Sequence, residues 1–352
     1  MELNNIIFLF LLLTFGYFLN TYALLLSKKF KFNLISDNQF DKPQAFHKKS
    51  TYRIGGITIY LLLSLIFLYL FFFKNIFYFE YISFITLFFF LGLADDLKVD
   101  IPPKFRLLIM LVLLMTLIIQ NDLYIKKTGL EFLNNFLEID IFSLFFVSLC
   151  FLFIINGSNL IDGFNGLLAI HSLIILIILL FINFINGFND LAYILFYSNI
   201  TIIIFLKFNF PRAKMFLGDS GAYLIGILIA LSIIKTSILN PNIHPFFFSI
   251  LLFYLFFEVF FSFFRKLFFE SLNPLLPDNK HLHMLIYKLL KKINKKKSNL
   301  NHKVTLYINL IYFILIIPGV IFMENGLFCR YYFFSLLIFY IIFYKKLCER
   351  IK

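Results

Sequence analysis

The sequence predicts an all-α polytopic protein that crosses a membrane about eleven times. Of its 352 residues, 61% are hydrophobic, and the mean hydropathy is +0.90. A soluble globular domain is about 45–50% apolar, whereas a membrane-spanning helix needs about 20 mostly apolar residues. Apolar runs close to that length recur along this chain. We therefore expect residues 1–352 to form a single integral membrane domain.

Each apolar run is interpreted as one transmembrane helix. The first run lacks the basic flank of a secretory signal and is expected to be retained. The third run, residues 80–94, is the shortest of the eleven. In chain order, the expected spans are 4–26, 55–73, 80–94, 106–121, 141–156, 166–185, 190–206, 220–236, 245–263, 304–323 and 327–344.

The basic residues indicate how the chain is oriented. Alternating spans place residues 28–54, 95–105, 156–165, 207–219, 264–303 and the tail from Lys345 on one side. Only five of the 32 Lys and Arg residues lie on the opposite side, which leaves 27 for this set and its edge. The positive-inside rule places the basic side in the cytoplasm, with the N-terminus outside and the C-terminus inside.

The formal net charge of +13 has the same interpretation. We read it as an orientation signal and as an attraction for anionic membrane lipids. Nucleic-acid binding explains it less well, because the basic residues are distributed by side of the membrane. The three cysteines, at 150, 329 and 348, form no CxxC pair, so they suggest neither a disulfide framework nor a zinc site.

Residues 156–167 are the most polar interruption of the apolar pattern. They contain three Asn, three Gly and Asp162 between two long apolar runs. Polar groups at such a place are costly in lipid, so they are expected to face a cavity or the water boundary. Glycine lets a backbone approach a ligand closely, and Asn supplies donors and acceptors. This pattern predicts part of a binding site at a membrane edge.

Four other polar clusters fall on the same side. A lone Asp at a helix end is commonly a cap, but adjacent Asp95 and Asp96 repel each other unless a cation or a proton-transfer role accommodates them. The spacing of His281 and His283 makes a poor metal site, so we favour hydrogen bonds to an anionic ligand. The clusters are Asp41 to His47 with Arg53 to Gly56; Asp95 and Asp96 with Lys104 and Arg106; Asn209 to Gly221; and Arg265 with Asp278 to His283.

Together, these clusters favour a phosphate-handling enzyme. Carboxylates from three segments suit Mg²⁺ bound with a diphosphate, with Mn²⁺ as an alternative ion. Lys, Arg and His side chains would neutralise phosphate charge. The sequence has no P-loop pattern, so its phosphate site would differ from that of an ATPase.

At these motifs the sequence resembles the polyprenyl-phosphate N-acetylhexosamine-1-phosphate transferases, the superfamily that includes MraY and WecA. The resemblance is carried by five motifs that occur in the family's order between residues 41 and 283. They are D-x-P…H…R-x-G-G at 41–56, ADD at 94–96 with Lys104 and Arg106, NxxNxxDGxNGL at 156–167, NFPxAxxFLGDSG at 209–221 and HLH at 281–283.

The resemblance implies a reaction in a bacterial cytoplasmic (inner) membrane, with the active site facing the cytoplasm. Undecaprenyl phosphate would attack a UDP-N-acetylhexosamine, giving a polyprenyl-diphosphate-sugar and UMP. Asp219 is the implied Mg²⁺ ligand, with Asp95 and Asp162 as further candidates. The implied catalytic residues are Asp95, Asp96, Asp162 and Lys104. The implied substrate-binding residues are His47, Arg53, Asn156, Asn159, Asn165, Asn209, Arg265, His281 and His283.

Departures from the family pattern indicate which branch of the family the sequence resembles most. Many members carry Asp where this chain has Asn165, and many carry another His where it has Met284. HLH in place of three consecutive His argues against the MraY peptidoglycan step and favours the initiation of a surface polysaccharide or O-antigen, although the MraY-type reaction stays an alternative. Glu258 resembles an acid common in the polysaccharide branch, with Arg265 as its expected partner.

Other classes of protein fit less well. A transporter or flippase of polyprenyl-linked sugars predicts charges and broken helices near the bilayer midplane, whereas the charges here gather at one interface. A catalytically inactive scaffold has no need of Asp95, Asp96 and Asp219. The spacing typical of CDP-alcohol phosphatidyltransferases is not found in the sequence. The sequence identifies neither the sugar nor the oligomeric state, and a homodimer is left open.

Overall fold

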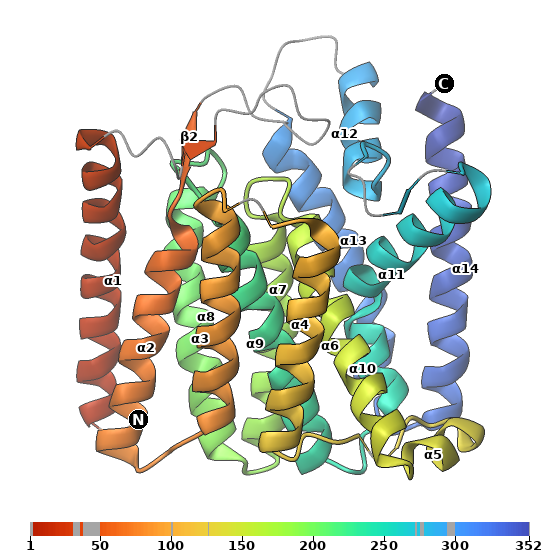
Figure 1. Ribbon diagram of the computed structural model, residues 1–352, viewed down its shortest axis with the longest axis horizontal. Coiled ribbons are helices and arrows are strands. Elements are labelled where there is room, and N and C mark those ends of the chain that lie inside the picture. Colours follow the sequence, from red (N-terminus) through yellow and green to blue (C-terminus); the bar gives the residue numbers. More distant parts are fainter. Residues whose placement is uncertain are drawn as a thin grey trace.

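The computed structural model describes residues 3–30, 36–37, 50–99, 101–125, 127–271, 273–274, 278–293 and 300–351. These residues form a bundle of helices with one small sheet (Figure 1). The helices are α1 (Leu3–Lys29), α2 (Gly55–Lys74), α3 (Phe79–Asp96), α4 (Pro103–Gln120), α5 (Glu131–Leu137), α6 (Asp140–Ile161), α7 (Leu167–Ile185), α8 (Asn189–Asn209), α9 (Gly218–Leu239), α10 (Pro245–Leu251), α11 (Phe253–Phe264), α12 (Leu282–Ile293), α13 (Asn301–Ile321) and α14 (Gly326–Ile351). A π-helical turn, Arg265–Phe269, continues α11.

The all-α polytopic fold is confirmed, and a helix occupies each of the eleven expected spans. In the described part of the chain, nine helices are long and apolar enough to cross a membrane, or ten if α10 and α11 count as one. The one expected span outside this set is the third, 80–94, which corresponds to α3; it has the length but also carries Glu80, Asp95 and Asp96. These charges keep it outside the set chosen by length and apolarity.

The expected straight span 245–263 is broken. The structure divides it into α10 and α11, whose axes are bent by 75° between Leu251 and Phe253. Neither proline nor glycine marks the break, because the residues there are Leu251, Leu252 and Phe253. An apolar pattern therefore predicts the length of this segment but not its change of direction.

Helix α9 lies at the centre of the bundle and packs against α2, α3, α6 and α7. In the 18-residue apolar stretch of α9, 78% of the residues are buried, whereas in that of α14 only 17% are buried. Small residues permit the close packing of α9: a Cβ on Gly92 of α3 would lie 2.5 Å from the Cα of Ser220. The central helix therefore begins in a tightly enclosed place.

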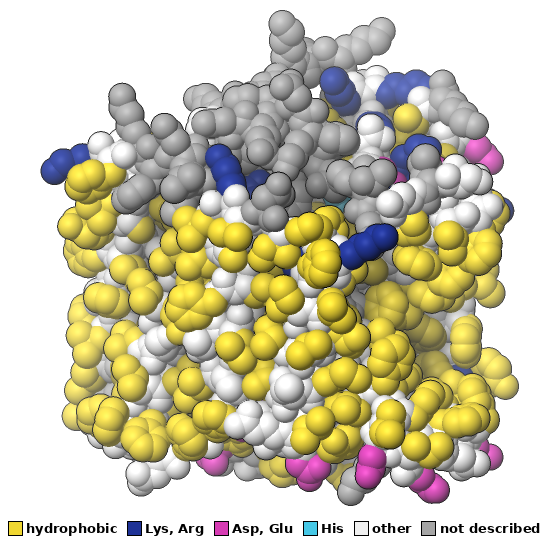
Figure 2. Space-filling view, in the orientation of Figure 1, with side chains coloured by type: hydrophobic (Ala, Val, Ile, Leu, Met, Phe, Trp, Pro, Cys, Tyr) yellow, Lys and Arg dark blue, Asp and Glu magenta, His cyan; other side chains and the backbone are white. Residues whose placement is uncertain are grey.

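The two ends of the bundle differ in charge. Figure 1 shows the N-terminal end of α1 at one end of the bundle and the C-terminus at the other, beside α12. On the face in Figure 2, a wide hydrophobic band lies between an upper end where most of the visible Lys and Arg gather and a lower end where most of the visible Asp and Glu gather. This distribution agrees with the charge asymmetry of the sequence.

The small sheet, which the sequence analysis did not predict, joins two of the polar clusters. Strand β1 (Ser36–Asp37) pairs antiparallel with β2 (Thr51–Arg53), and β2 pairs parallel with β3 (Met215–Phe216). In this register Arg53 lies opposite Phe216, and the Gly56 backbone N–H donates to the Leu217 carbonyl at 2.8 Å. Arg53 is thereby held beside the start of α9.

Several expected connecting segments are partly helical. Helix α6 continues to Ile161, so Asn156 and Asn159 lie on its last turns and not in a loop. The expected loop 264–303 contains the π-helical turn and α12. Asn and Gly lower the helix propensity of a segment, but they do not prevent a helix where packing against neighbouring helices stabilises it. The end of α6 is therefore helical despite its Asn and Gly residues.

Candidate active site

The first turn of α9 is held by a carboxylate from another helix. Asp96, at the end of α3, accepts hydrogen bonds from the backbone N–H groups of Asp219 at 2.9 Å and Ser220 at 3.0 Å. It also accepts the Ser220 hydroxyl at 2.6 Å. The first N–H groups of a helix have no partner within the helix and favour negative charge. Asp96 therefore caps α9 and fixes the turn that carries Asp219.

Gly218 makes this cap possible. Its φ of 78° lies in the left-handed region, and an added Cβ would lie 2.5 Å from Asp96 Oδ2. Side chains other than hydrogen are strained at such a φ. Glycine is thus required here both by the backbone and by the carboxylate beside it.

The neighbouring Asp95 has different partners. Its Oδ2 is 3.0 Å from Arg106 Nη1, and it accepts the Tyr223 hydroxyl at 3.1 Å. The two adjacent acids therefore diverge, Asp95 to a cation on α4 and Asp96 to the end of α9. Each carboxylate therefore has its own hydrogen-bond donors, which offset the cost of placing two acids side by side.

Arg53 lies between two of the acids. Its Nη1 is 3.7 Å from Asp96 Oδ1 and 3.8 Å from Asp219 Oδ2. About a quarter of each of the Arg53 and Asp219 side chains stays exposed, whereas the Asp96 side chain is fully buried. Arg53 and Asp219 can therefore reach a ligand that Asp96 cannot.

Asp162 joins the same group from the end of α6. Burial raises its pKa well above the usual range, the charges of Asp219 and Asp96 raise it further, and Arg53 opposes them. Three carboxylates thus surround one guanidinium. The group therefore carries more negative than positive charge. An anionic ligand such as a diphosphate would bind there more favourably together with a cation.

The donor chemistry of this acidic group fits Mg²⁺, although the protein supplies few ligands. Among the residues that the structure describes, no group of three or more His, Cys, Asp or Glu side chains is arranged to hold a metal. Mg²⁺ commonly takes one or two carboxylates and completes its coordination with water and substrate phosphates. Asp219 suits that mode of binding because about a quarter of its side chain is exposed, and Asp162, whose pKa responds to the charge of Asp219, is the second candidate ligand.

Two of the predicted substrate-binding Asn residues hold loops together. Asn209 donates to the Met215 carbonyl at 2.9 Å and accepts the Gly166 backbone N–H at 2.5 Å. Asn165 donates from its side chain to the Pro211 carbonyl at 3.1 Å and is buried. Both amides connect the loop after α6 to the loop before α9. Their prediction as substrate ligands is untested, but their present contacts are structural.

The HLH motif is built around a buried acid on α11. Glu258 Oε2 is 3.1 Å from His281 Nδ1, and Glu258 Oε1 accepts the Leu282 backbone N–H at 3.1 Å. The other His281 ring nitrogen, Nε2, is 3.3 Å from Asp278 Oδ1. His281 is thereby held between two carboxylates.

His283 points toward the polar loop after α6. It stacks on His281 with ring centroids 5.6 Å apart, and a Cβ on Gly163 would lie 3.7 Å from its Nε2. Its Nδ1 is 3.3 Å from the Tyr254 hydroxyl, whereas its buried Nε2 has no hydrogen-bond partner among the described residues. Burial lowers the pKa of His283 to about 4, which leaves the ring neutral near pH 7. A neutral ring can offer an N–H to a ligand at this loop.

The expected pairing of Arg265 with Glu258 is wrong. Arg265 is 2.7 Å from Glu270 and 2.5 Å from Asp278, both on the segment that leads to the HLH motif. Glu258 instead takes its hydrogen bonds from His281, Leu282 and Tyr340. Sequence proximity suggested the pair, but the π-helical turn carries Arg265 toward the following segment.

The remaining predicted residues are placed less centrally. Lys104 is exposed on the first turn of α4, two residues before Arg106. Asn156 donates to the Leu152 carbonyl within its own helix at 2.8 Å, and Asn159 is half-buried near the same end. His47 lies outside the described residues.

Sequence reasoning missed several residues that shape the site. Tyr223 follows Asp219 by four positions on α9, a spacing that places both on one helix face and could have indicated it. Tyr254 and Tyr340 carry no such signal, because both lie in Phe-rich apolar runs. Their hydroxyls are identified only by the packing of distant helices.

Comparison with known proteins agrees with this site. A family model described as "Glycosyl transferase family 4" matches residues 78–237, which include Asp95, Asp96, Asp162 and Asp219. An undecaprenyl-phosphate alpha-N-acetylglucosaminyl 1-phosphate transferase of Thermotoga maritima is 28% identical over 285 residues, covering 80% of this chain and 81% of that protein. The protein of the same name from Escherichia coli K12 is 26% identical, covering 56% of this chain and 54% of that protein.

A decaprenyl-phosphate N-acetylglucosaminephosphotransferase of Mycobacterium leprae is 34% identical over 85 residues, or 22% of this chain and 21% of that protein. The matches agree in kind, and the acids that gather at the start of α9 lie within the matched family region. Residues 78–237 thus match the glycosyl transferase family 4 model, and most of the chain is similar to a named polyprenyl-phosphate N-acetylglucosaminyl 1-phosphate transferase.

Proposed function

We propose that this protein transfers N-acetylhexosamine 1-phosphate from a UDP-sugar to undecaprenyl phosphate. An oxygen of the lipid phosphate attacks the β-phosphorus of the donor, and the bond from that phosphorus to the bridging oxygen breaks. The products are UMP and a polyprenyl-diphosphate-sugar. The observation that carries the proposal is the group formed by Asp162, Asp219 and Arg53 beside the capped start of α9.

The residues of this group have complementary tasks. Arg53 pairs with phosphate oxygens, since a guanidinium favours such contacts. Asp219 and Asp162 would hold Mg²⁺, which would neutralise the diphosphate charge when bound. The acceptor is a phosphate monoester with a second pKa near about 6, so it is largely ionised at neutral pH. Positioning is therefore more important than a strong general base.

The HLH motif supplies the other wall. His283 directs its unpartnered Nε2 toward Gly163, so it offers a hydrogen bond to the donor's phosphate or sugar. His281 is fixed between Glu258 and Asp278 and supports His283 by stacking. The contacts of both histidines favour binding of the nucleotide-sugar over proton transfer.

The membrane setting follows from the charge distribution. We place the active site on the cytoplasmic face of a bacterial cytoplasmic membrane, where UDP-sugars are made and the basic segments are expected. The named relatives favour UDP-N-acetylglucosamine as the donor. The product would then initiate a surface polysaccharide or O-antigen, with the peptidoglycan reaction as the alternative.

A flippase is the second candidate, because the 75° bend between α10 and α11 is a feature of many transporters. Against it, the buried acid of α11 is satisfied by His281 and by the Leu282 backbone at one end of the bundle. The acids Asp162 and Asp219 also gather at that end. The geometry therefore favours a reaction at the interface over movement of a polar group through the bilayer.

The test is a donor screen in which the two possible leaving nucleotides are measured separately. The purified full chain in lipid nanodiscs receives undecaprenyl phosphate, Mg²⁺ and one of UDP-N-acetylglucosamine, UDP-N-acetylgalactosamine or UDP-N-acetylmuramoyl-pentapeptide. Release of UMP with formation of a lipid-diphosphate-sugar supports the proposal. Release of UDP, or of no nucleotide with any donor, overturns it. The donor that reacts decides between the polysaccharide and peptidoglycan branches.

A further inference from the structure

The last helix, α14, makes polar contacts with residues that flank or hold the HLH motif, namely Glu258, Lys280 and Lys292. Figure 1 shows its C-terminal half beside α12, and Lys292 of α12 donates to the Arg350 carbonyl at 3.0 Å. The helix is mostly exposed along its length. Two of its buried residues, Tyr340 and Tyr344, connect it to the surroundings of the HLH motif.

Tyr340 completes the hydrogen bonds of a buried acid. Its hydroxyl donates to Glu258 Oε1 at 3.1 Å, the same oxygen that accepts the Leu282 backbone N–H. Glu258 is 1% exposed, and its other oxygen faces His281. A buried carboxylate that loses a donor is left partly unsatisfied, and the remaining donors must then shift to compensate.

Tyr344 acts one turn later on the same helix. Its hydroxyl donates to the Lys280 carbonyl at 2.9 Å, immediately before His281. The two tyrosines therefore act on His281 through its neighbours. Tyr344 holds the backbone of the preceding residue, and Tyr340 holds the carboxylate that lies beside the His281 ring.

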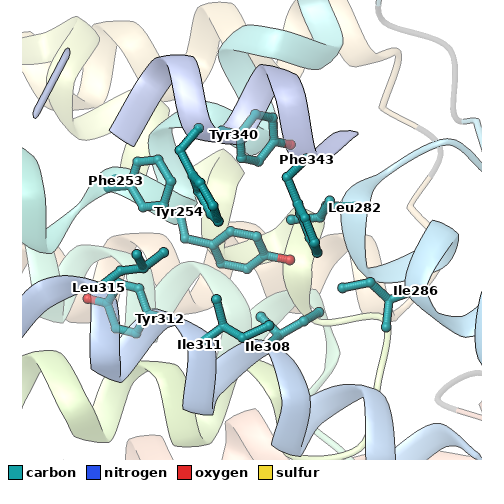
Figure 3. A pocket seen from close by; sticks show the side chains of 11 residues that line it. Phe253, Tyr254, Leu282, Ile286, Ile308, Ile311, Tyr312, Leu315, Tyr340 and Phe343 are labelled. Atoms are coloured by element: carbon teal, nitrogen blue, oxygen red, sulfur yellow. The ribbon is translucent and has the colours of Figure 1, made fainter. Parts of the chain in front are cut away.

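Aromatic packing holds the two tyrosines at these positions. The ring of Phe261 on α11 lies 5.4 Å from that of Tyr340 and 4.6 Å from that of Tyr344. Below this contact, α11, α12, α13 and α14 enclose an apolar pocket, shown in Figure 3 with Tyr254, Tyr340 and Leu282 in its wall. The hydroxyl of Tyr340 leaves this pocket wall to reach Glu258 of α11, and that of Tyr344 reaches the Lys280 carbonyl just before α12.

We propose that Tyr340 and Tyr344 are positioning residues that set the place of His281 and His283 for binding of the nucleotide-sugar. The inference rests on the proposed function, because it assigns the HLH motif to that donor. It extends the site to a helix that lies outside the region matched by the family. Neither tyrosine touches the acidic group directly in the contacts described above.

The test compares Tyr340→Phe and Tyr344→Phe with Tyr332→Phe in the full chain in nanodiscs. Tyr332 is a matched control, since its hydroxyl donates to the Leu315 carbonyl at 2.7 Å elsewhere on the same helix. We expect the first two variants to raise the KM for the UDP-sugar about tenfold, with kcat within about twofold of the unaltered enzyme. A merely structural role would reduce the amount of active enzyme at unchanged KM, and that result would overturn the inference.

Hydrogen exchange gives a second measurement that does not depend on turnover. Backbone amides in 278–288 should exchange faster in Tyr340→Phe and Tyr344→Phe than in the unaltered protein, and at an unchanged rate in Tyr332→Phe. Equal exchange in all four proteins overturns the positioning role. If the unaltered protein releases no UMP, the proposed function fails, and the exchange result still decides whether α14 positions the motif.

Discussion

Asp96 and Ser220 are joined by two hydrogen bonds across the interface of α3 and α9, one from the serine hydroxyl at 2.6 Å and one from its backbone N–H at 3.0 Å. Asp219 adds a third donor to the same carboxylate. Asp96 is thus occupied by the end of α9, whereas the adjacent Asp95 pairs with Arg106. The two acids of one motif have different tasks, and Asp96 acts through the turn that carries Asp219.

Replacing Asp96 should loosen that turn. In Asp96→Asn, the amide keeps one acceptor oxygen and directs an NH₂ group at backbone donors. We expect unfolding to become easier by about 1–3 kcal/mol and UMP release to fall by at least about tenfold. Ser220→Ala removes one of three donors and should cost about 1 kcal/mol with most activity kept. Thermal unfolding in nanodiscs checks both, and an unchanged melting temperature in Asp96→Asn would show that the cap is unimportant.

Gly218 offers a sharper test of the same cap, because the chain contains a matched glycine. Gly187 has a φ of 80°, close to the 78° of Gly218, but an added Cβ there meets nothing within 4 Å. Gly187→Ala should therefore cost only the backbone strain of about 1 kcal/mol. Gly218→Ala adds a collision with Asp96 and should be clearly less stable. Equal melting temperatures for the two variants would contradict the close approach of Asp96.

Asp162 and Asp219 should determine the requirement for Mg²⁺. Losing either carboxylate removes a hard oxygen ligand, so Asp162→Asn and Asp219→Asn should raise the Mg²⁺ concentration for half-maximal UMP release by about tenfold or more. Asp140→Asn is the control, because Asp140 is an exposed acid at the start of α6, whereas Asp162 lies at the end of that helix.

The raised pKa of Asp162 means that its carboxylate protonates at a higher pH than a free Asp. The Mg²⁺ requirement should therefore increase as the pH falls, and Asp162→Asn should weaken that trend; a parallel trend in the variant would remove Asp162 from the metal site.

The sequence allowed the helices to be predicted because apolar length alone decides which segments can span a bilayer. It also indicated that Asp162, Asp219 and Arg53 belong to one site, since the expected orientation placed their segments on one side. The bend between α10 and α11 was not predictable, because an apolar run has the same composition whether it is straight or broken. The predicted partner of Arg265 was wrong because a π-helical turn, which the sequence does not reveal, directs Arg265 toward Glu270 and Asp278.

The division of tasks between Asp95 and Asp96 required the structure. Adjacent residues on a helix point in different directions, and only the position of α9 shows which acid meets its N-terminus. Tyr340 is a similar case, because it is 82 positions from Glu258 in a Phe-rich segment. A hydroxyl in such a run gives no sign of its partner until the helices are packed.

The depressed pKa of His283 predicts how stability changes with pH. The pKa is 6.5 for an unperturbed His and about 4 for buried His283. As the pH falls from about 6.5 to about 4, the unfolded chain takes up a proton that folded His283 does not, so folding stability must decrease over that window.

Buried acids also contribute to the pH dependence of folding stability. The experiment therefore compares the pH dependence of folding stability between the unaltered protein and its variants. His283→Gln should lose part of the dependence, whereas His302→Gln, a half-buried control at the start of α13, should retain it. Unfolding in nanodiscs, followed at intervals from pH 7 to pH 4, measures the slopes. If the curves of the unaltered protein and His283→Gln stay parallel, His283 takes up its proton equally in the folded and unfolded chain, and the neutral N–H assigned to it in donor binding has no support.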